Sequence, residues 1–332
     1  MRAWEVQVPK PAEQHPLVLV DRSVPQPGPG EVLLKVLACG VCHTDLHVAE
    51  GDLAPHRQPV VPGHEIVAEV VERGPGVTHL RPGNKVGVTW LAYSCGECEF
   101  CRSGRENLCP KARFTGYDVD GGYADYTVAR ADYVAPLPGG FDPLEVAPLL
   151  CAGVIGYRSL RLANVQPGHR LGLVGFGASA HLAIQVARYW GSEVYAFTRS
   201  DAHRQLALQM GAAWAGGLED EAPQQCDSMV LFAPSGSLVT QSLRHLQKGG
   251  TLAINAVHLG DIPPIPYEFI FGERSLRTVS HVTRRDATEF LALAMKIHLK
   301  TKVEVFPFVE ANEALVAVKE ARVNGAAVLA FG

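Results

Sequence analysis

Four cysteines lie close together near residue 100, and their spacing could hold a metal ion. Cys95, Cys98, Cys101 and Cys109 fall within fifteen residues, separated by two, two and seven residues. Thiolates are soft ligands that suit Zn²⁺, and a loop of this length can wrap four of them tetrahedrally around the ion with no open position. Such a closed site stabilises a lobe and does no chemistry. An iron–sulfur cluster uses similar ligands and stays an alternative.

A second group of possible ligands lies in two other segments. One is Cys39-Gly-Val-Cys42-His43-Thr44-Asp45-Leu-His47, and the other is Pro62-Gly63-His64-Glu65. Two thiolates and an imidazole with one open position are a ligand set of catalytic zinc. The chain therefore combines a candidate structural zinc site with a candidate catalytic one.

A glycine-rich turn is typical of dinucleotide binding. It runs from an apolar strand through Gly175-Phe176-Gly177-Ala178-Ser-Ala180 into a helix. Gly175 permits a tight turn, Gly177 lets the backbone approach a pyrophosphate at the helix N-terminus, and Ala180 allows the helix to pack closely on the strand. A strand-to-helix turn without a ligand is the alternative.

The end of the next strand predicts which nicotinamide cofactor is used. An acidic residue there would bind the ribose 2′-OH of NAD, but the chain has Thr198-Arg199-Ser200. Arg199 and Ser200 could hold a 2′-phosphate through charge and hydroxyl. We therefore expect NADP(H) to be favoured over NAD(H), with use of NADH or of both cofactors as the alternative.

The elements that position these residues show two patterns. Up to about residue 145, short β-rich runs such as 31–37 and 66–71 are punctuated by Pro and Gly, which indicates a compact β-rich domain. From about residue 152, strands alternate with helices, and this alternation predicts a parallel sheet. The segments concerned are strands at 170–174 and 193–197, helices at 178–190 and 201–210, later helices at 287–297 and 312–322, and a last strand at 327–331.

Length and charge exclude several classes of protein. The 332 residues suit two domains, and a net charge of −4 from 30 basic and 34 acidic side chains gives no support to nucleic-acid binding. No apolar stretch reaches the ~18 residues that span a bilayer. The first residues contain no signal peptide, so we expect a cytoplasmic protein, and metal binding explains its eight cysteines better than a disulfide framework does.

Four motifs in order resemble the zinc-containing alcohol dehydrogenases of the medium-chain dehydrogenase/reductase superfamily, over the whole chain. They are the run from Cys39 to His47, Gly63-His64-Glu65, the four-cysteine loop and Leu149-Leu-Cys151-Ala-Gly. The resemblance implies an α/β protein with a β-rich GroES-like catalytic domain at 1–151 and 283–332. It places a Rossmann domain with a doubly wound parallel sheet at 152–282.

The resemblance also implies a catalytic zinc ligand set. Its members are Cys42, His64 and Cys151, with water or substrate oxygen in the fourth position. Asp45 matches the carboxylate that hydrogen-bonds the free ring nitrogen of the zinc-bound histidine. Glu65 matches a glutamate that sits behind the zinc. With the four-cysteine loop, this makes two Zn²⁺ per subunit.

The activity implied is hydride transfer between NAD(P)(H) and a small primary alcohol or its aldehyde. Thr44 would pass the alcohol proton through the nicotinamide ribose to His47, and His43 would lie near the pyrophosphate. Trp90, five residues before Cys95, matches an aromatic wall of the substrate pocket. The family further implies a homotetramer or a homodimer.

One stretch departs from the family pattern. Many members carry an arginine after a glycine in the last strand region, but the chain reads Asn324-Gly325-Ala326, so His43 and the helix N-terminus carry more of the pyrophosphate contact. A polyol dehydrogenase or another zinc-dependent medium-chain reductase remains an alternative. The zinc-free quinone and enoyl reductases lack these ligands, and a non-enzymatic zinc- and nucleotide-binding protein is the rival from a different class.

Overall fold

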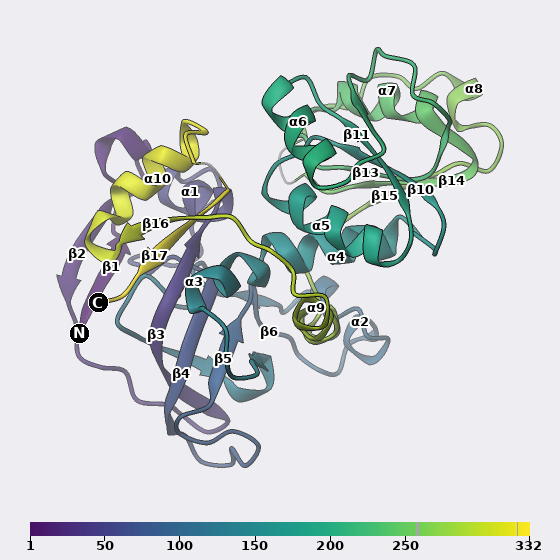
Figure 1. Ribbon diagram of the computed structural model, residues 1–332. Coiled ribbons are helices and arrows are strands. Elements are labelled where there is room, and N and C mark those ends of the chain that lie inside the picture. Colours follow the sequence, from purple (N-terminus) through teal and green to yellow (C-terminus); the bar gives the residue numbers. More distant parts are fainter. Residues whose placement is uncertain (257–258, 324) are drawn as a thin grey trace. The chain divides into compact units, whose positions relative to one another are not determined.

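The computed structural model describes residues 1–256, 259–323 and 325–332, which divide into two units (Figure 1). The first unit holds residues 1–151, 281–292 and 300–332, and the second holds 152–280 and 293–299. The domain prediction assigned 293–299 to the first unit, whereas these residues group with the second. They include the last turn of α9 (Arg284–Lys296), so the division falls inside a helix and not in a loop.

The first unit is built on a seven-stranded sheet. Its order is β16-β17-β3-β4-β5-β9, with β8 pairing to β3 as well. All pairs are antiparallel except β16 with β17. The strands are β3 (Glu31–Val41), β4 (Glu65–Arg73), β5 (Lys85–Val88), β8 (Tyr126–Arg130), β9 (Val134–Pro136), β16 (Val303–Pro307) and β17 (Ala326–Ala330). Two hairpin-like pairs flank it: β1 (Arg2–Val6) with β2 (Leu17–Asp21), and β6 (Leu91–Tyr93) with β7 (Arg113–Phe114).

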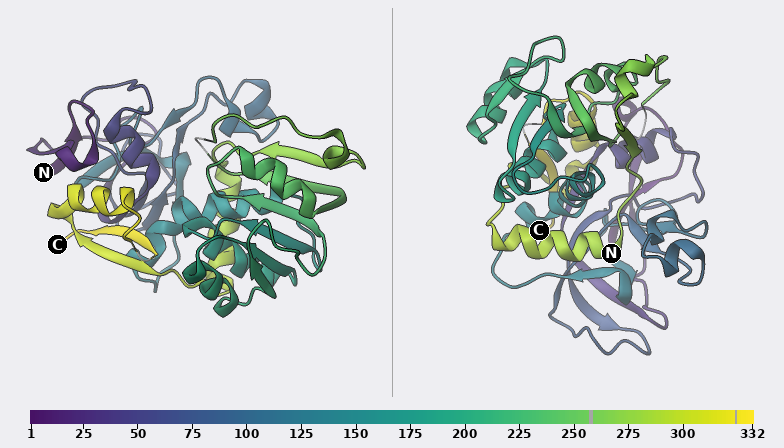
Figure 2. Two further views of the ribbon diagram at one scale, coloured as in Figure 1. Left: turned by 90° about the horizontal axis from the view of Figure 1, so that it is seen from above. Right: turned by 90° about the vertical axis from the view of Figure 1, so that its right-hand side faces the viewer.

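The end of the chain returns to this first sheet. Figures 1 and 2 show α10 (Ala311–Lys319) lying along β16 and β17, and β17 adds to the edge of β3. The return places Leu329 opposite Cys39 in the register. The remaining helices of this unit are α1 (His43–Glu50), α2 (Glu99–Arg102) and α3 (Pro143–Val146), with short 3₁₀ turns at Ala12–Gln14, Glu106–Leu108, Ala131–Tyr133, Ala147–Leu150 and Phe308–Glu310.

The second unit contains a six-stranded, fully parallel sheet. The strand order is β12-β11-β10-β13-β14-β15, so the chain starts in the middle, winds out to one edge and then returns to build the other half. This confirms the predicted doubly wound α/β fold. Its elements are α4 (Ala152–Leu162), β10 (Arg170–Val174), α5 (Ala178–Tyr189), β11 (Glu193–Phe197), α6 (Asp201–Gln209), β12 (Trp214–Gly216), β13 (Cys226–Leu231), α7 (Ser237–His245), β14 (Leu246–Ile254), α8 (Tyr267–Ile270) and β15 (Ser275–Thr278).

Local sequence signals account for the ends of these elements. The Ser200 side chain accepts a hydrogen bond from the backbone N–H of His203, as an N-cap of α6 does, and Gly211 follows that helix at φ 91°. The predicted helices at 287–297 and 312–322 begin earlier in the structure, at Arg284 and Ala311.

Two sequence predictions concern the stretch 324–326 and the absence of a membrane-spanning segment. Asn324, in the stretch that departs from the family pattern, lies outside the described residues, whereas Ala326 begins β17. No helix in the described part of the chain is long and apolar enough to cross a membrane. The cytoplasmic location stays a prediction.

Candidate functional site

The four clustered cysteines come together within one loop of the first unit. Cys95 follows β6, Cys98 and Cys101 lie at the start and inside of α2, and Cys109 ends a 3₁₀ turn. All four sulfurs lie within 4.8 Å of one another.

The distances between the cysteine sulfurs match those expected around a tetrahedral zinc ion. Two Sγ–Sγ separations are 3.5 Å (Cys109–Cys95) and 3.9 Å (Cys95–Cys101). Four Zn–S bonds of about 2.3 Å give a tetrahedral edge of about 3.8 Å, so the set fits zinc.

Backbone donors reinforce the thiolates of this loop. The N–H of Cys98 points to Cys95 Sγ at 3.4 Å, and the N–H of Lys111 points to Cys109 Sγ at 3.4 Å. Hydrogen bonds from the backbone of Glu97 and Cys98 lower the pKa of the Cys95 thiol to about 6. The loop thus favours the deprotonated form of Cys95, the form that a metal requires, while burial and hydrogen bonds with the neighbouring thiols raise the pKa of Cys98 to about 11.

The second cluster gathers ligands from three separate places in the first unit. Cys42 caps the N-terminus of α1, His64 directly precedes β4, and Cys151 follows the last 3₁₀ turn before α4. Their ligand atoms, with a carboxylate oxygen of Glu65, lie within 4.8 Å of one another.

Geometry and burial make this second set suitable for zinc. Cys42 Sγ and His64 Nε2 are 3.5 Å apart, close to the value of about 3.6 Å expected for sulfur and nitrogen on one tetrahedral zinc. A hydrogen bond from Cys151, and the nearby His64, lower the pKa of the Cys42 thiol despite its burial.

Asp45 fixes the orientation of the histidine ligand. Its Oδ1 lies 3.0 Å from His64 Nδ1, which leaves Nε2 directed at Cys42, and the same oxygen accepts the N–H of Gly63 at 3.2 Å. Its Oδ2 accepts the N–H of Cys42 at 3.0 Å and completes the capping box of α1. One buried carboxylate, 1 % exposed, therefore holds both the helix start and the ring.

The carboxylate of Glu65 lies beside the ligand atoms of Cys42, His64 and Cys151, in space left by a glycine. Glu65 is 3 % exposed, and burial raises the pKa of its carboxyl well above the ordinary value. A Cβ on Gly40 of β3 would come within 1.8 Å of Glu65 Oε2. Gly40 therefore provides the space that the carboxylate fills.

Trp90 belongs to an aromatic cluster next to His64. Its ring lies edge-on to His64 at 5.0 Å and stacks on Phe114 at 5.1 Å, and its Nε1 donates to Nδ1 of His281 at 3.1 Å. Sequence analysis missed Phe114 and His281. Phe114 sits between polar residues, and His281 is almost two hundred residues further along the chain than Trp90, so neither shows a spacing signal.

The polar residues of α1 face different surroundings. The backbone N–H of Thr44 points to Cys42 Sγ at 3.3 Å. One turn later, His47 is half-buried and its Nδ1 lies 2.8 Å from Asp52 Oδ2, a partner that the sequence did not reveal. His43 is exposed. Thr44 and His47 are three residues apart and lie on one face of the helix.

The glycine-rich turn of the second unit is shaped to admit a ligand. Gly175 has φ 86°, and a Cβ there would meet the backbone N of Ala233 at 3.0 Å. Gly177 is the N-cap of α5, and a Cβ there would face open space, whereas Phe176 and Ala180 are buried. Ala178 is the first residue of α5. The backbone is thus open at the helix N-terminus, where a pyrophosphate binds in this fold.

The end of β11 carries no acidic side chain. Thr198 is half-buried, and its carbonyl accepts Nε of Arg204 at 2.9 Å. Arg199 is exposed, and no hydrogen bond or ion pair of its side chain is found within the residues described. Ser200 is exposed, and its hydroxyl is engaged as the N-cap of α6.

Comparison with protein families assigns both units. An alcohol dehydrogenase GroES-like domain matches residues 28–139, and a zinc-binding dehydrogenase domain matches residues 180–296. The probable alcohol dehydrogenase AdhA of Mycobacterium tuberculosis (strain CDC 1551 / Oshkosh) is 48% identical, covering 99% of this chain and 97% of that protein. An alcohol dehydrogenase of Geobacillus stearothermophilus is 39% identical over 90% of this chain and 91% of its own length.

Solved structures agree with these sequence matches. A cobalt- and zinc-bound thermostable alcohol dehydrogenase from Pyrobaculum aerophilum has a TM-score of 0.89 at 26% identity, covering 100% of this chain and 99% of the other. The Helicobacter pylori CAD complexed with NADP(H) has a TM-score of 0.88 at 25% identity, with coverages of 99% and 97%. Given the fold, the ligand clusters and the relatives, this chain belongs to the alcohol dehydrogenase family of zinc-binding dehydrogenases and is an oxidoreductase that acts on an alcohol or its aldehyde.

Proposed function

We propose that the protein is a zinc-dependent, NADP(H)-preferring dehydrogenase of small primary alcohols and their aldehydes. The observation that carries this proposal is the partly buried cluster of Cys42, His64 and Cys151, in which the 3.5 Å separation between Cys42 Sγ and His64 Nε2 suits zinc. The four-cysteine loop would hold a second, structural zinc ion.

When bound, the zinc ion would supply Lewis acidity toward the alcohol or aldehyde oxygen, and the nicotinamide would exchange hydride. The chain's own residues prepare the site. Asp45 keeps His64 in the tautomer that presents Nε2 to the metal. Trp90 and Phe114 form an apolar wall that excludes water from one side of the site.

Proton movement is assigned to α1. The Thr44 hydroxyl would accept the proton of the alcohol while passing on its own, and His47 would release a proton to solvent. His47 is half-buried and hydrogen-bonded to Asp52, which is exposed, so this imidazole connects the interior with water. The backbone around Gly177 would hold the pyrophosphate, and the role of His43 there rests on the family resemblance.

The NADP(H) preference rests on Thr198, Arg199 and Ser200. The exposed guanidinium of Arg199 at the end of β11, without an ion-pair partner among the described residues, suits a 2′-phosphate, and residues 198–200 contain no carboxylate that would repel it. We expect Thr198→Asp combined with Arg199→Leu to shift the ratio of kcat/KM for NADPH over NADH by about tenfold or more toward NADH. An unchanged ratio would show that this loop does not select the cofactor.

A homotetramer or a homodimer is proposed for the assembly. The last strand of the parallel sheet, β15, leaves one edge unpaired in the described structure, and most of its side chains are exposed. An unpaired edge of this kind can join a symmetric copy. Light scattering of the purified protein tests the state directly.

The decisive experiment measures zinc and activity together. The protein is purified with its metal, zinc per subunit is counted by atomic emission, and oxidation of NADPH and NADH is followed with short-chain and aromatic aldehydes. Aldehyde-dependent oxidation that a zinc chelator abolishes is the expected result. Two zinc ions per subunit without turnover on any aldehyde would contradict the proposed activity.

A further inference from the structure

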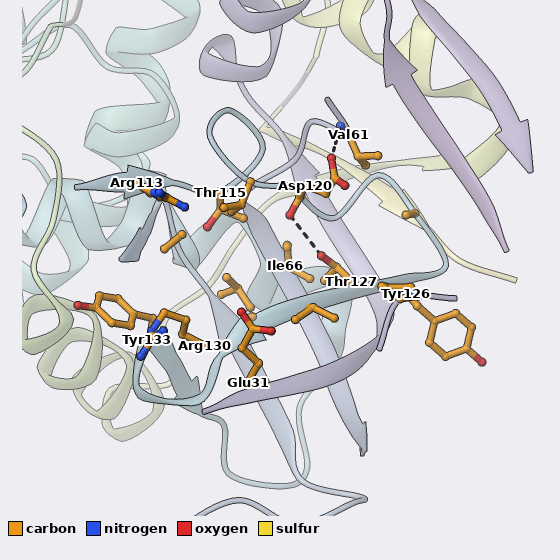
Figure 3. Close-up of a pocket in the computed structure, with 18 of the residues that line it drawn as sticks. Glu31, Val61, Ile66, Arg113, Thr115, Asp120, Tyr126, Thr127, Arg130 and Tyr133 are labelled. Carbon is orange, nitrogen blue, oxygen red and sulfur yellow. Dashed lines mark hydrogen bonds between the residues drawn. The ribbon is translucent and has the colours of Figure 1, made fainter. Parts of the chain in front are cut away.

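The first unit contains a cavity of about 610 Å³ that the proposed chemistry does not use. Residues of β3, β4, β5, β6, β7 and β8 line it, and Figure 3 shows it in close-up. None of the residues assigned above to zinc, substrate or proton transfer lines it. Its volume falls within the range of about 300–1,000 Å³ that is usual for sites of small organic molecules.

Positive charge dominates the walls of this cavity. Four arginines line it, against two carboxylates, those of Glu31 and Asp120, in a chain whose net charge is negative. Asp120 is already occupied, because its Oδ2 lies 3.2 Å from Arg22 and 3.3 Å from Arg57 and its Oδ1 accepts the N–H of Val61. Figure 3 shows this carboxylate turned toward Val61.

The other two arginines have no carboxylate partner within the part of the chain that the structure describes. Arg113 of β7 is exposed and makes no side-chain hydrogen bond or ion pair among the described residues. Arg130 ends β8 directly opposite Glu31 in the register, but no carboxylate oxygen of the described chain lies within 4.0 Å of it, and Glu31 Oε2 instead accepts the N–H of Gly28 at 2.9 Å.

Arg130 is also partly removed from water. Its Nε is buried without any hydrogen-bond partner, and its guanidinium lies over the ring of Tyr93 at 5.4 Å. A cation that has lost part of its hydration and has no counter-ion attracts an anion more strongly than a fully solvated one. The ring of Tyr93 holds the guanidinium in place, which lowers the entropy lost when an anion binds.

The rest of the lining mixes hydroxyl-bearing and apolar side chains. Ala92, Val119, Val128 and Ala129 are its partly exposed apolar members, and the cavity is far larger than an inorganic anion needs. We propose that this cavity binds an organic anion, a carboxylate or a phosphate monoester with an apolar body, whose charged group pairs with Arg113 and Arg130. The apolar body would lie against Val119 and Val128, and the forked guanidinium groups suit both carboxylate and phosphate oxygens.

Titration calorimetry on the zinc-loaded, full-length protein tests the proposal with three probes. Phenylacetate and phenyl phosphate carry the two kinds of anion, and phenylacetamide is the neutral counterpart. We expect one anion per subunit to bind with a Kd of about 0.1–1 mM, and the neutral amide to bind at least about tenfold more weakly. Comparison of the two anions decides whether the site prefers carboxylate or phosphate.

Two variants locate the binding. Arg130→Met and Arg113→Met should each weaken anion binding by about tenfold or more, and Arg113 is exposed, so its replacement leaves the fold intact. Arg81→Met, an exposed arginine outside the cavity, is the matched control and should bind as the original chain does. All three variants should keep aldehyde turnover, because none of these residues touches the proposed zinc site.

Three results would overturn the proposal. They are an absence of saturable anion binding to the unaltered chain, equal binding of the neutral amide, and anion binding that survives in Arg113→Met and Arg130→Met. The last result, joined with competition between the anion and the aldehyde, would place the anion at the catalytic zinc instead. Failure of aldehyde turnover leaves this calorimetric test unaffected, so the two proposals fail independently.

Discussion

The two candidate zinc clusters of this protein are assembled in opposite ways. The four-cysteine cluster takes every ligand from one loop of fifteen residues. The other cluster joins Cys42, His64 and Cys151, which come from segments more than twenty and more than eighty residues apart. A bound metal can organise the first cluster locally, whereas the sheet must be in place before the second exists.

The supporting contacts differ in the same way. Around the four cysteines the donors are backbone N–H groups of the loop itself. Around His64 they come from a buried carboxylate on α1, and Glu65 approaches through the space at Gly40. The loop therefore suits a closed structural site, and the buried set suits a site whose ligands must stay oriented while one position exchanges.

Removing a ligand of the buried cluster should have the largest effect. Cys151→Ala is expected to lower kcat/KM by at least about a thousandfold, because several kcal/mol of transition-state stabilisation by the metal are lost and each 1.36 kcal/mol is a factor of ten. Zinc per subunit should fall from two to one, measured by atomic emission. Cys226→Ala, a buried cysteine outside both clusters, is the control and should keep both zinc ions.

Removing the hydroxyl of Thr44 should have the next largest effect. Thr44→Ala is expected to reduce kcat by about a hundredfold, which is typical for loss of a positioned proton-transfer group. Thr44→Ser keeps the hydroxyl and should restore most of the turnover. If Thr44→Ala turns over like the unaltered enzyme with zinc content unchanged, the proton leaves by another route.

Asp45 tests the orienting contact of the buried cluster. Asp45→Asn keeps the side-chain shape but removes the charge that faces His64 Nδ1, so zinc affinity or turnover should fall by about tenfold to a hundredfold. Competition with a chelator measures the affinity. A matching loss of zinc from the four-cysteine loop would mean that the two clusters are not independent.

The smallest effect on catalysis is expected from removing a ligand of the four-cysteine cluster. Cys101→Ser should remove one zinc ion and lower Tm by about 5–10 °C, which corresponds to a few kcal/mol for a domain of this size. The kcat per folded molecule should stay within about twofold. A Tm and a zinc content that both remain unchanged would show that Cys101 is not a ligand.

Sequence alone predicted what is local. The four-cysteine spacing and the Gly175–Ala180 turn are contained in short segments, and each corresponds to a formed element in the structure. The fold class followed from the alternation of strands and helices, because the period of apolar residues differs between them.

Contacts between distant segments were beyond prediction from the residues themselves. His281 accepts a hydrogen bond from Trp90, and Arg113 and Arg130 meet at a cavity, only because the sheet brings their strands and loops together. Asp52 lies five residues from His47, but an exposed aspartate in a turn is so common that its pairing with the imidazole gave no signal. The assignment of Cys151 likewise depended on resemblance to a known family.

Gly40 shows how a residue without a functional group can be indispensable to a reactive centre. Even a methyl group at this position of β3 would occupy the place of Glu65 Oε2 and crowd its Cβ, at 1.8 Å and 2.8 Å. The smallest possible replacement, alanine, would force the buried carboxylate or the strand to move. In a saturation mutagenesis experiment, Gly40 should therefore tolerate substitution as poorly as a zinc ligand, although it never touches metal, substrate or cofactor.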